Sequence, residues 1–218
     1  KNIPAWSLPG SIKFQDVLDS GVKLPLQPID ITFEDVAFLQ YTGGTTGVAK
    51  GAMLTHRNIV ANLLQSRAWL PQLDDSAEII ITALPLYHIF ALTANCLTFM
   101  YLGGSNILIT DPRDMPGFVK ELARHPFTAI TGVNTLFNGL LNTEGFDQLD
   151  FSTLKMTLGG GMAVQKSVAD KWKQVTGVTL LEAYGLTETS PAACINPIDL
   201  EEYNGYIGLP ISSTEAAI

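Results

Sequence analysis

Charged residues are scarce in this sequence of 218 residues: Asp, Glu, Lys and Arg make up 16% of it, against about 25% in a typical soluble domain. The balance is acidic, with 21 Asp and Glu against 13 Lys and Arg, and a formal net charge of −8. Nucleic acids bind to basic surfaces, so we expect no nucleic-acid partner. The 46% of hydrophobic residues excludes a disordered chain, because disorder requires low hydrophobicity and high net charge.

Cysteine is scarce too, with Cys96 and Cys194 as the two examples. Their spacing matches neither a disulfide framework nor a metal-binding motif, which favours a reducing compartment. The sequence begins Lys1-Asn2-Ile3-Pro4 without methionine or a secretory signal, and we interpret this as a processed or excised start. We therefore expect a cytoplasmic protein, and peripheral contact with the inner membrane stays an open alternative.

Charge is absent altogether from residues 79–110. About 20 apolar residues are enough to span a membrane, so this run has the length of a membrane helix. Pro85, His88 and the pair Gly103-Gly104 interrupt it. Because such residues mark turns, we predict a buried strand, loop, helix, turn and strand instead of a membrane span.

The first third of the chain predicts a connector followed by a hairpin and a helix. Residues 1–34 are proline-rich and read as a surface connector. Residues 36–41 read as a buried strand, and 52–54 as its return after a loop rich in glycine and threonine. Thr55 can cap a helix that ends before Pro71. The apolar positions that we expect on its buried face are Ile59, Leu63, Leu64 and Ala68.

The rest of the chain alternates between strand and helix patterns. Strands are expected to begin near Ile79, Ser105, Thr128, Leu154 and Val178, with helices over 90–101, 115–124, 134–143 and 163–176. This alternation predicts an α/β fold, a layered and mostly parallel sheet flanked by helices. We expect four parts: the connector 1–34, the hairpin and helix 35–72, an α/β subdomain 73–212, and a strand that begins the next subdomain at 213–218.

Polar or glycine-rich loops follow four of the predicted strands. They are Pro85–His88, Gly132–Thr135, Gly159–Gly161 and Tyr184–Glu188. Ligands of open parallel sheets bind beyond the carboxyl ends of the strands. These loops therefore predict one composite binding site.

The loop over 42–51 has the composition of a phosphate cradle. Glycines expose backbone N–H groups to an anion, threonines add hydroxyls and the lysine adds positive charge. A mobile hairpin tip is the alternative. The Walker A motif does not fit, because Lys50 is flanked by Ala49 and Gly51. The candidate phosphate-binding residues are Thr42, Gly43, Gly44, Thr45, Thr46, Gly47 and Lys50.

Three motifs together resemble the adenylate-forming enzymes. Residues 41–51 read YTGGTTGVAKG, residues 84–88 read LPLYH and residues 184–189 read YGLTET. The sequence of the first motif is most similar to that of bacterial long-chain fatty-acid–CoA ligases. Gly43 and Ala49 depart from the general family loop, where serine and proline are common. The resemblance covers residues 35–218 and implies a central piece of the family's large N-terminal domain.

The resemblance implies an ATP- and Mg²⁺-dependent reaction in which a carboxylic acid becomes an acyl-adenylate and then a thioester of coenzyme A. Lys50 would stabilise the departing pyrophosphate and Thr187 would bond the α-phosphate. Thr42 and Glu188 would hold Mg²⁺. His88 would orient the acyl carboxylate, which makes Lys50, His88, Thr187 and Glu188 the implied catalytic set.

The resemblance also assigns the remaining site residues. The implied nucleotide-binding residues include Gly160, Gly161, Met162, Tyr184 and Gly185. The implied acyl-binding residues are His88, Ile89, Leu92, Val133 and Gly159.

The substrate class follows from a further absence. Residues 89–101 contain no acidic side chain, and a buried ammonium group without an acidic partner is unfavourable. This disfavours an amino acid and favours an acid with an apolar tail, whereas the long-chain fatty acid is implied by the resemblance alone and the acyl length stays open. We expect the 218 residues alone to be inactive. A non-catalytic nucleotide- or acyl-binding module and a ligase for another apolar acid are the alternatives, and the oligomeric state stays open.

Overall fold

A computed structural model describes residues 7–42 and 49–217. The chain divides into two compact units, Lys1–Thr32 and Phe33–Ile218. In the first unit, helix α1 (Phe14–Gly21) lies in a stretch free of proline, and none of its residues is buried. Within the described residues 7–34, the expected connector is thus exposed but contains a helix that we did not predict. The boundaries of the four predicted parts stay a prediction.

The second unit begins with an antiparallel hairpin of β1 (Val36–Thr42) and β2 (Lys50–Thr55). The predicted return strand is confirmed. The prediction of a buried strand at 36–41 was wrong, because β1 alternates between exposed and half-buried residues. A two-stranded hairpin packs one face against the rest of the unit, so its other face stays open to solvent.

Helix α2 (His56–Trp69) follows directly and begins at the predicted cap. The Thr55 side chain accepts a bond from the Asn58 N–H, and the Asn58 side chain accepts one from the Thr55 N–H. The predicted buried face was right at Ile59 and wrong at the other three positions: Leu64 is 47% exposed. Leu63 is half-buried and Ala68 exposed, whereas the buried residues are Ile59, Asn62 and Ser66.

Polar side chains hold α2 against the far end of the chain. The Asn62 amide donates to the Ala192 carbonyl at 2.8 Å and accepts from the Ala192 N–H at 3.1 Å. Gln65 donates to the Ser212 carbonyl at 2.6 Å, and the Trp69 ring N–H donates to the Asn196 carbonyl at 3.2 Å. A polar buried stripe therefore replaces the apolar one that the sequence predicts.

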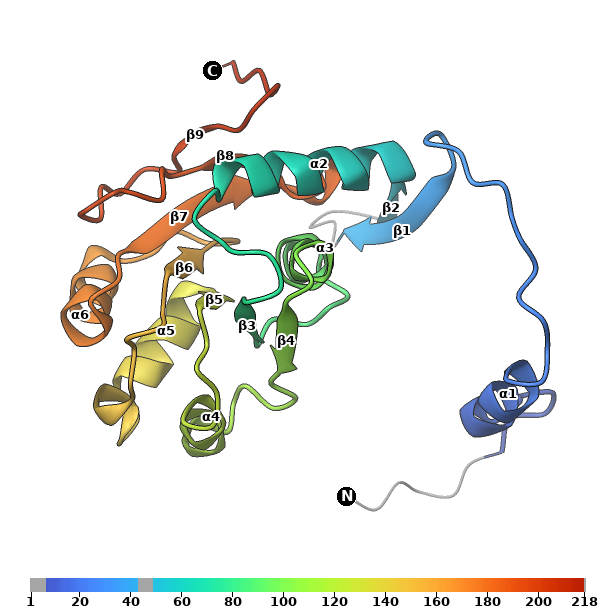
Figure 1. The fold of residues 1–218 in the computed structure, drawn as a ribbon, viewed down its shortest axis with the longest axis horizontal. Helices are drawn as coiled ribbons and strands as arrows, with labels where there is room; N and C mark the ends of the chain where they lie inside the picture. Colours follow the sequence, from blue (N-terminus) through green and yellow to red (C-terminus); the bar gives the residue numbers. More distant parts are fainter. Residues whose placement is uncertain (1–6, 43–48, 218) are drawn as a thin grey trace. The chain divides into compact units, whose positions relative to one another are not determined.

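The main sheet has seven strands in the order β4-β3-β5-β6-β7-β8-β9 (Figure 1). The first five strands in this order run parallel, as predicted, and the last two run antiparallel. We did not predict β8 and β9, which are short and lie in the irregular stretch after Glu188. The bounds are β3 (Ile79–Thr82), β4 (Ser105–Leu108), β5 (Ala129–Gly132), β6 (Met156–Gly159), β7 (Leu180–Gly185), β8 (Ala192–Ile195) and β9 (Leu209–Pro210).

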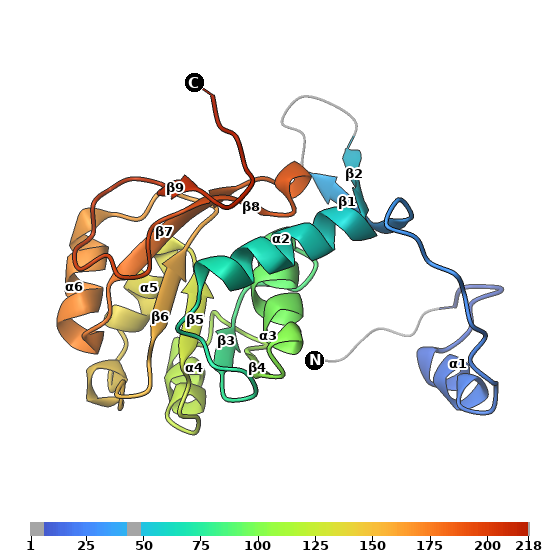
Figure 2. The same cartoon turned by 45° about the horizontal axis from the view of Figure 1, so that its top comes forward.

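Helices cover both faces of this sheet (Figures 1 and 2). One face packs on α4 (Met115–Leu122), α5 (Asn134–Leu141) and α6 (Lys166–Thr176). The other face packs on α2, on the π-helix η1 (Ala91–Leu97) and on α3 (Thr98–Tyr101). Neighbouring strand residues alternate between the two sides, so Ile81 joins the first core and Ile80 the second. Two 3-10 turns complete the unit, η2 (Phe146–Gln148) and η3 (Thr187–Thr189).

The uncharged run 79–110 forms β3, η1, α3 and β4, which confirms the predicted order of strand, helix and strand. The prediction that all of it is buried was wrong, because Met100, Tyr101 and Leu108 are 65%, 57% and 54% exposed. Asn95, fully buried in η1, donates to the Thr82 hydroxyl at 3.1 Å and accepts from the Thr131 hydroxyl at 2.9 Å. Within the described residues, no helix is long and apolar enough to cross a membrane.

The strand expected at 213–218 was wrong for the residues that the structure describes, 213–217, where no strand is present. Ser213 has a φ of 57°, in the left-handed region, which breaks an extended conformation. The Thr214 N–H bonds the Ile211 carbonyl at 3.1 Å and closes a turn there.

Candidate active site

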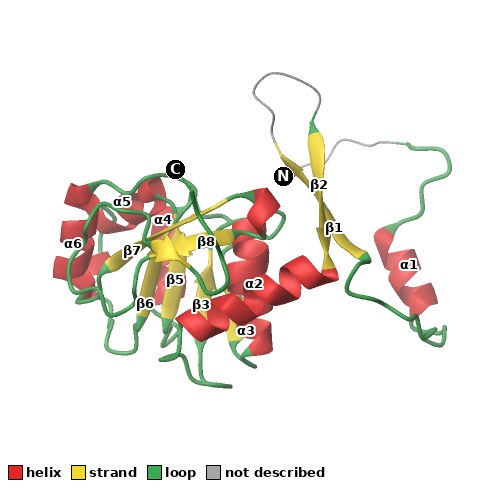
Figure 3. Cartoon of the chain, turned by 90° about the horizontal axis from the view of Figure 1, so that it is seen from above, coloured by secondary structure: helices red, strands yellow, loops and turns green. Residues whose placement is uncertain are grey.

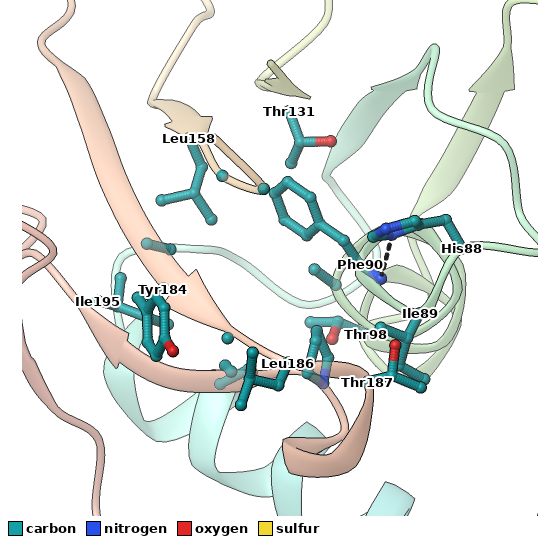
Figure 4. Close-up of a pocket in the computed structure, with 18 of the residues that line it drawn as sticks. His88, Ile89, Phe90, Thr98, Thr131, Leu158, Tyr184, Leu186, Thr187 and Ile195 are labelled. Atoms are coloured by element: carbon teal, nitrogen blue, oxygen red, sulfur yellow. Dashed lines mark hydrogen bonds between the residues drawn. The ribbon is translucent and has the colours of Figure 1, made fainter. Parts of the chain in front are cut away.

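A cavity of about 340 Å³ opens at the carboxyl ends of β5, β6 and β7 (Figure 4). Helices α2 and η1 form one wall of it and strand β8 contributes to another. Three of the four predicted loops reach it, through His88, through Gly160 and Gly161, and through residues 184–188. From the fourth loop's strand the lining residue is Thr131, one position before the predicted segment.

The cavity brings together nine of the residues that the sequence singled out. They are Thr42, His88, Ile89, Gly160, Gly161, Tyr184, Gly185, Thr187 and Glu188. Their roles stay predictions. These residues come from distant parts of the chain, so the hairpin, the η1 segment and the β7 motif meet at this cavity.

Five predicted residues lie outside the lining. Lys50 is exposed on β2, paired with Thr42 across the hairpin. Leu92 packs in a small core under the hairpin, and Val133 packs on the main core. Gly159 is buried in β6, and Met162 is 62% exposed. The predicted residues Gly43, Gly44, Thr45, Thr46 and Gly47 lie outside the described residues.

His88 has a defined hydrogen-bond arrangement. Its Nδ1 accepts from the Phe90 N–H at 3.2 Å (Figure 4). A nitrogen that accepts carries no proton, so the neutral ring holds its proton on Nε2. His88 is exposed, so this N–H is available to donate to an anionic oxygen.

Glycines permit close contacts in the wall. A Cβ on Gly160 would lie 3.0 Å from the Phe90 ring. A Cβ on Gly185 would lie 1.9 Å from the Pro191 carbonyl oxygen. Side chains at these positions would therefore clash with the ring of Phe90 or with the backbone of Pro191, just before β8.

The mouth of the cavity carries the acidic group. Glu188 is exposed in η3, and the Thr42 hydroxyl bonds the Lys50 carbonyl at 3.3 Å. The described residues include no cluster of three or more His, Cys, Asp or Glu that could hold a metal by themselves. A carboxylate and a hydroxyl nevertheless fit Mg²⁺, which commonly takes one or two carboxylates and completes its shell with water and phosphate oxygens.

Several lining residues were not anticipated. They include Ser66, Leu70, Phe90, Ala94, Thr98, Met156, Leu158, Ala183, Pro191, Ala192 and Ile195. Phe90 stands two residues after His88, so the motif could have drawn attention to it. Ile195 belongs to β8, which the sequence pattern did not reveal.

Comparisons with known proteins agree with this geometry. The AMP-binding enzyme family model matches residues 5–218. A curated long-chain-fatty-acid–CoA ligase of Yersinia pestis is 59% identical over 99% of this chain and 39% of its own length. One from Bacillus subtilis is 40% identical over 84% of this chain and 33% of its own length. The chain therefore spans about 39% of the length of the first of these curated relatives.

Solved structures share the fold. Apo MatB from Rhodopseudomonas palustris superposes with a TM-score of 0.76 at 28% identity, over 90% of this chain and 38% of that one. The anthranilate CoA ligase AuaEII gives a TM-score of 0.81 at 22% identity, over 96% of this chain and 40% of that one, and supports the fold alone. From its motifs, its sheet and the match over nearly its whole length, the chain belongs to the AMP-binding enzyme family.

Proposed function

We propose that the complete protein activates a long-chain fatty acid with ATP and Mg²⁺, forming an acyl-adenylate and then a coenzyme A thioester. The observation that carries this proposal is one cavity that combines polar residues of the three motifs with a largely apolar lining. The ligases that share up to 59% identity with this chain support the same reaction.

The apolar interior fits an acyl chain. Along β6 the lining extends from Gly160 through Leu158 to Met156, about 13 Å at about 3.3 Å per residue. An extended hydrocarbon advances about 1.3 Å per carbon, given C–C bonds of about 1.5 Å. Roughly ten carbons would therefore fill this length. Glu188 is the one Asp, Glu, Lys or Arg among the described lining residues, which disfavours a substrate with a buried charge.

His88 is proposed to orient the carboxylate. Its Nε2–H can donate to a carboxylate or α-phosphate oxygen while Nδ1 stays fixed by the Phe90 N–H. Thr187 also lines the cavity and adds a hydroxyl to it (Figure 4). Oriented donors of this kind stabilise negative charge that develops during acyl transfer to phosphate.

The nucleotide is proposed to bind between β7 and the glycine run. Tyr184, 44% exposed, offers its ring for stacking on adenine beside Gly160 and Gly161. Thr42 and Glu188 would hold Mg²⁺, which neutralises phosphate charge when bound. Lys50, on the hairpin, would contact the departing pyrophosphate.

Exchange of labelled pyrophosphate into ATP tests the reaction. The complete protein with palmitate should exchange, and the same protein with alanine should not. We expect the 218-residue chain alone to show no exchange, since it spans about 39% of the length of its Yersinia pestis relative. Clear turnover by the 218 residues would refute the proposal that they are an inactive part, and no exchange by the complete protein would refute the ligase function.

His88→Asn tests the orienting role. Asparagine keeps an acceptor near the Nδ1 position and removes the Nε2 donor, so the Phe90 contact can persist. We expect the exchange rate of the complete protein to fall about 10²-fold, the effect of losing one oriented donor. His125→Asn is the matched control, because His125 bonds Glu121 away from the cavity. Equal rates for both variants would exclude a role for His88.

We also place the complete protein in the cytoplasm, with peripheral contact at the inner membrane. This follows from the fatty-acid substrate, which partitions into bilayers. Flotation with vesicles, compared with and without palmitate, measures that contact.

A further inference from the structure

Val164 closes the loop that carries the glycine run, and both of its backbone polar groups are held by side chains from elsewhere. Its N–H donates to the carboxylate Oε1 of Glu182 at 2.8 Å. Its carbonyl accepts from the hydroxyl of Tyr203. Two side chains from separate elements, β7 and the segment between β8 and β9, thus fix one residue.

The Val164 side chain packs directly against the glycine run. A Cβ on Gly159 would lie 2.6 Å from the Val164 side chain, so the valine fills the space that the glycine leaves. In the middle of the run, the Gly160 N–H bonds the Gly132 carbonyl at 3.1 Å. Gly160 and Gly161 line the cavity. Their position therefore depends on where Val164 is held.

Glu182 is buried and is itself supported, whereas Tyr203 is half-buried. Glu182 is 6% exposed, and no Lys or Arg forms an ion pair with it in the described part of the chain. Its carbonyl accepts from the Asn196 N–H at 3.0 Å and from the Asn196 side chain at 3.2 Å. Asn204 donates to Asn196 at 2.9 Å. A buried carboxylate is unfavourable without partners, so its place in this network calls for a role.

Tyr203 is half-buried and lies beside the Glu182 carboxylate. Burial, followed by the neighbouring Glu182 carboxylate, raises the pKa of Tyr203 to about 12. The hydroxyl consequently stays protonated, and able to donate to Val164, across the whole physiological pH range.

We propose that Glu182 and Tyr203 are positioning residues that hold the glycine run Gly159–Gly161 in the wall of the cavity through the backbone of Val164. Neither residue lines the cavity, so each acts through Val164 and not by contact with a ligand. The consequence for nucleotide affinity rests on the function proposed above, whereas the clamp itself does not.

Hydrogen exchange on the complete protein, without substrates, tests the clamp without any reaction. Tyr203→Phe removes one hydroxyl and keeps the ring, so the fold should persist. Losing a hydrogen bond of about 1 kcal/mol corresponds to roughly fivefold faster opening. We expect that acceleration in residues 160–165 and none in β3 and β5. Tyr206→Phe is the matched control, because the Tyr206 side chain is 72% exposed.

Two substitutions at Glu182 distinguish loss of the hydrogen-bond acceptor from a mere change of charge at this position. Glu182→Gln keeps an acceptor for the Val164 N–H and should exchange within about twofold of the parent, whereas Glu182→Ala should match or exceed Tyr203→Phe. Unchanged exchange in residues 160–165 for both Tyr203→Phe and Glu182→Ala would overturn the proposal. So would acceleration spread evenly over the sheet, because that result indicates general destabilisation.

Steady-state kinetics of the complete protein supply the second readout. The KM for ATP should rise about fivefold in Tyr203→Phe with kcat unchanged. An unchanged KM for ATP alongside faster exchange would overturn the link between the clamp and the ligand. A parent protein with no ligase activity would instead refute the proposed function, and the exchange result would still decide the clamp.

Discussion

Lys155 lies between two carboxylates at the amino ends of β3 and β6. Its Nζ is 2.7 Å from Asp74 Oδ2 and 2.8 Å from Glu78 Oε1. The Glu78 side chain is fully buried, and its Oε1 also accepts from the Asp74 N–H at 2.6 Å. This ion cluster stands at the opposite edge of the sheet from the cavity, so its effect should be on stability and not on binding.

Removal of the lysine tests that effect. Lys155→Met keeps the aliphatic stem and leaves Glu78 buried without its cation, so the free energy of unfolding should fall by about 2–3 kcal/mol. Lys120→Met, at an exposed position on α4, is the matched control and should change it by less than about 0.5 kcal/mol. Urea denaturation measures both, and equal midpoints would contradict the expectation.

The same cluster predicts sensitivity to acid. A hydrogen bond and the charge of Lys155 lower the pKa of Asp74. For Glu78, burial acts to raise the pKa, but hydrogen bonds from Lys155, Thr128 and the Asp74 N–H together lower it. Groups with a lowered pKa stabilise the fold above their ordinary values and lose that contribution as the pH falls through the lowered ones.

The unfolding free energy should therefore fall as the pH drops below about 4.5. Lys155→Met should lose less stability over the same range, because its carboxylates no longer have a depressed pKa. Urea curves recorded between about pH 7 and pH 3 make the comparison. If the unfolding free energies of the parent and Lys155→Met fell in parallel with pH, other carboxylates would dominate the acid sensitivity.

At the scale of elements, α2 depends on polar contacts where the sequence predicts apolar ones. Asn62→Ala would leave the N–H and carbonyl of Ala192 without their partner, which should cost about 2 kcal/mol. Leu64→Ala, at a position expected to be buried but found 47% exposed, should cost less than about 0.5 kcal/mol. Unfolding curves for the two variants measure both losses. A larger loss for Leu64→Ala than for Asn62→Ala would support the predicted apolar face over the observed polar one.

The βαβ elements were predictable because each depends on local pattern. Val168 and Trp172 repeat at helical spacing on α6, and Gly177, with a φ of 78°, ends it as expected. Strands β3 to β7 read as short apolar runs, typical of a parallel sheet buried on both sides. Element by element, the parallel sheet and its helices therefore agree with the sequence pattern.

Other features depend on partners distant in the sequence. Strand β9 has two residues and pairs with β8 through contacts that no local pattern encodes. Asn62 is buried because Ala192 offers two backbone groups to it. In the candidate site, the motif residues were found from the sequence, whereas Phe90 and Ile195 required knowledge of what faces them across the cavity.

For the whole molecule, the hairpin presents an open apolar face. Leu39 and Met53 are paired across it, and with Tyr41 they are 62%, 70% and 67% exposed. Figure 3 shows the hairpin extending from the α/β core. Exposed apolar residues that cluster in this way bind hydrophobic probes.

We accordingly expect the 218-residue chain to bind a hydrophobic dye, and Leu39→Lys to reduce the fluorescence at least twofold, because the charge interrupts the apolar face. Leu108→Lys, at a leucine of similar exposure (54%) at the end of β4, is the control and should leave the signal within about a fifth of the parent. A larger loss for Leu108→Lys would place the dye elsewhere.

The polar contacts that hold α2 also have a consequence for synthesis on the ribosome. The partners of Asn62, Gln65 and Trp69 lie 127 to 147 residues later in the chain. At roughly 5–20 residues per second, these partners are made about 6–30 s after α2 itself. During that interval the strands from β3 to β7 can pair in the order in which they emerge, and these bonds of α2 can form only once residues 192–212 have been made. Translation speed between residues 62 and 212 thus sets the time during which this helix lacks those partners.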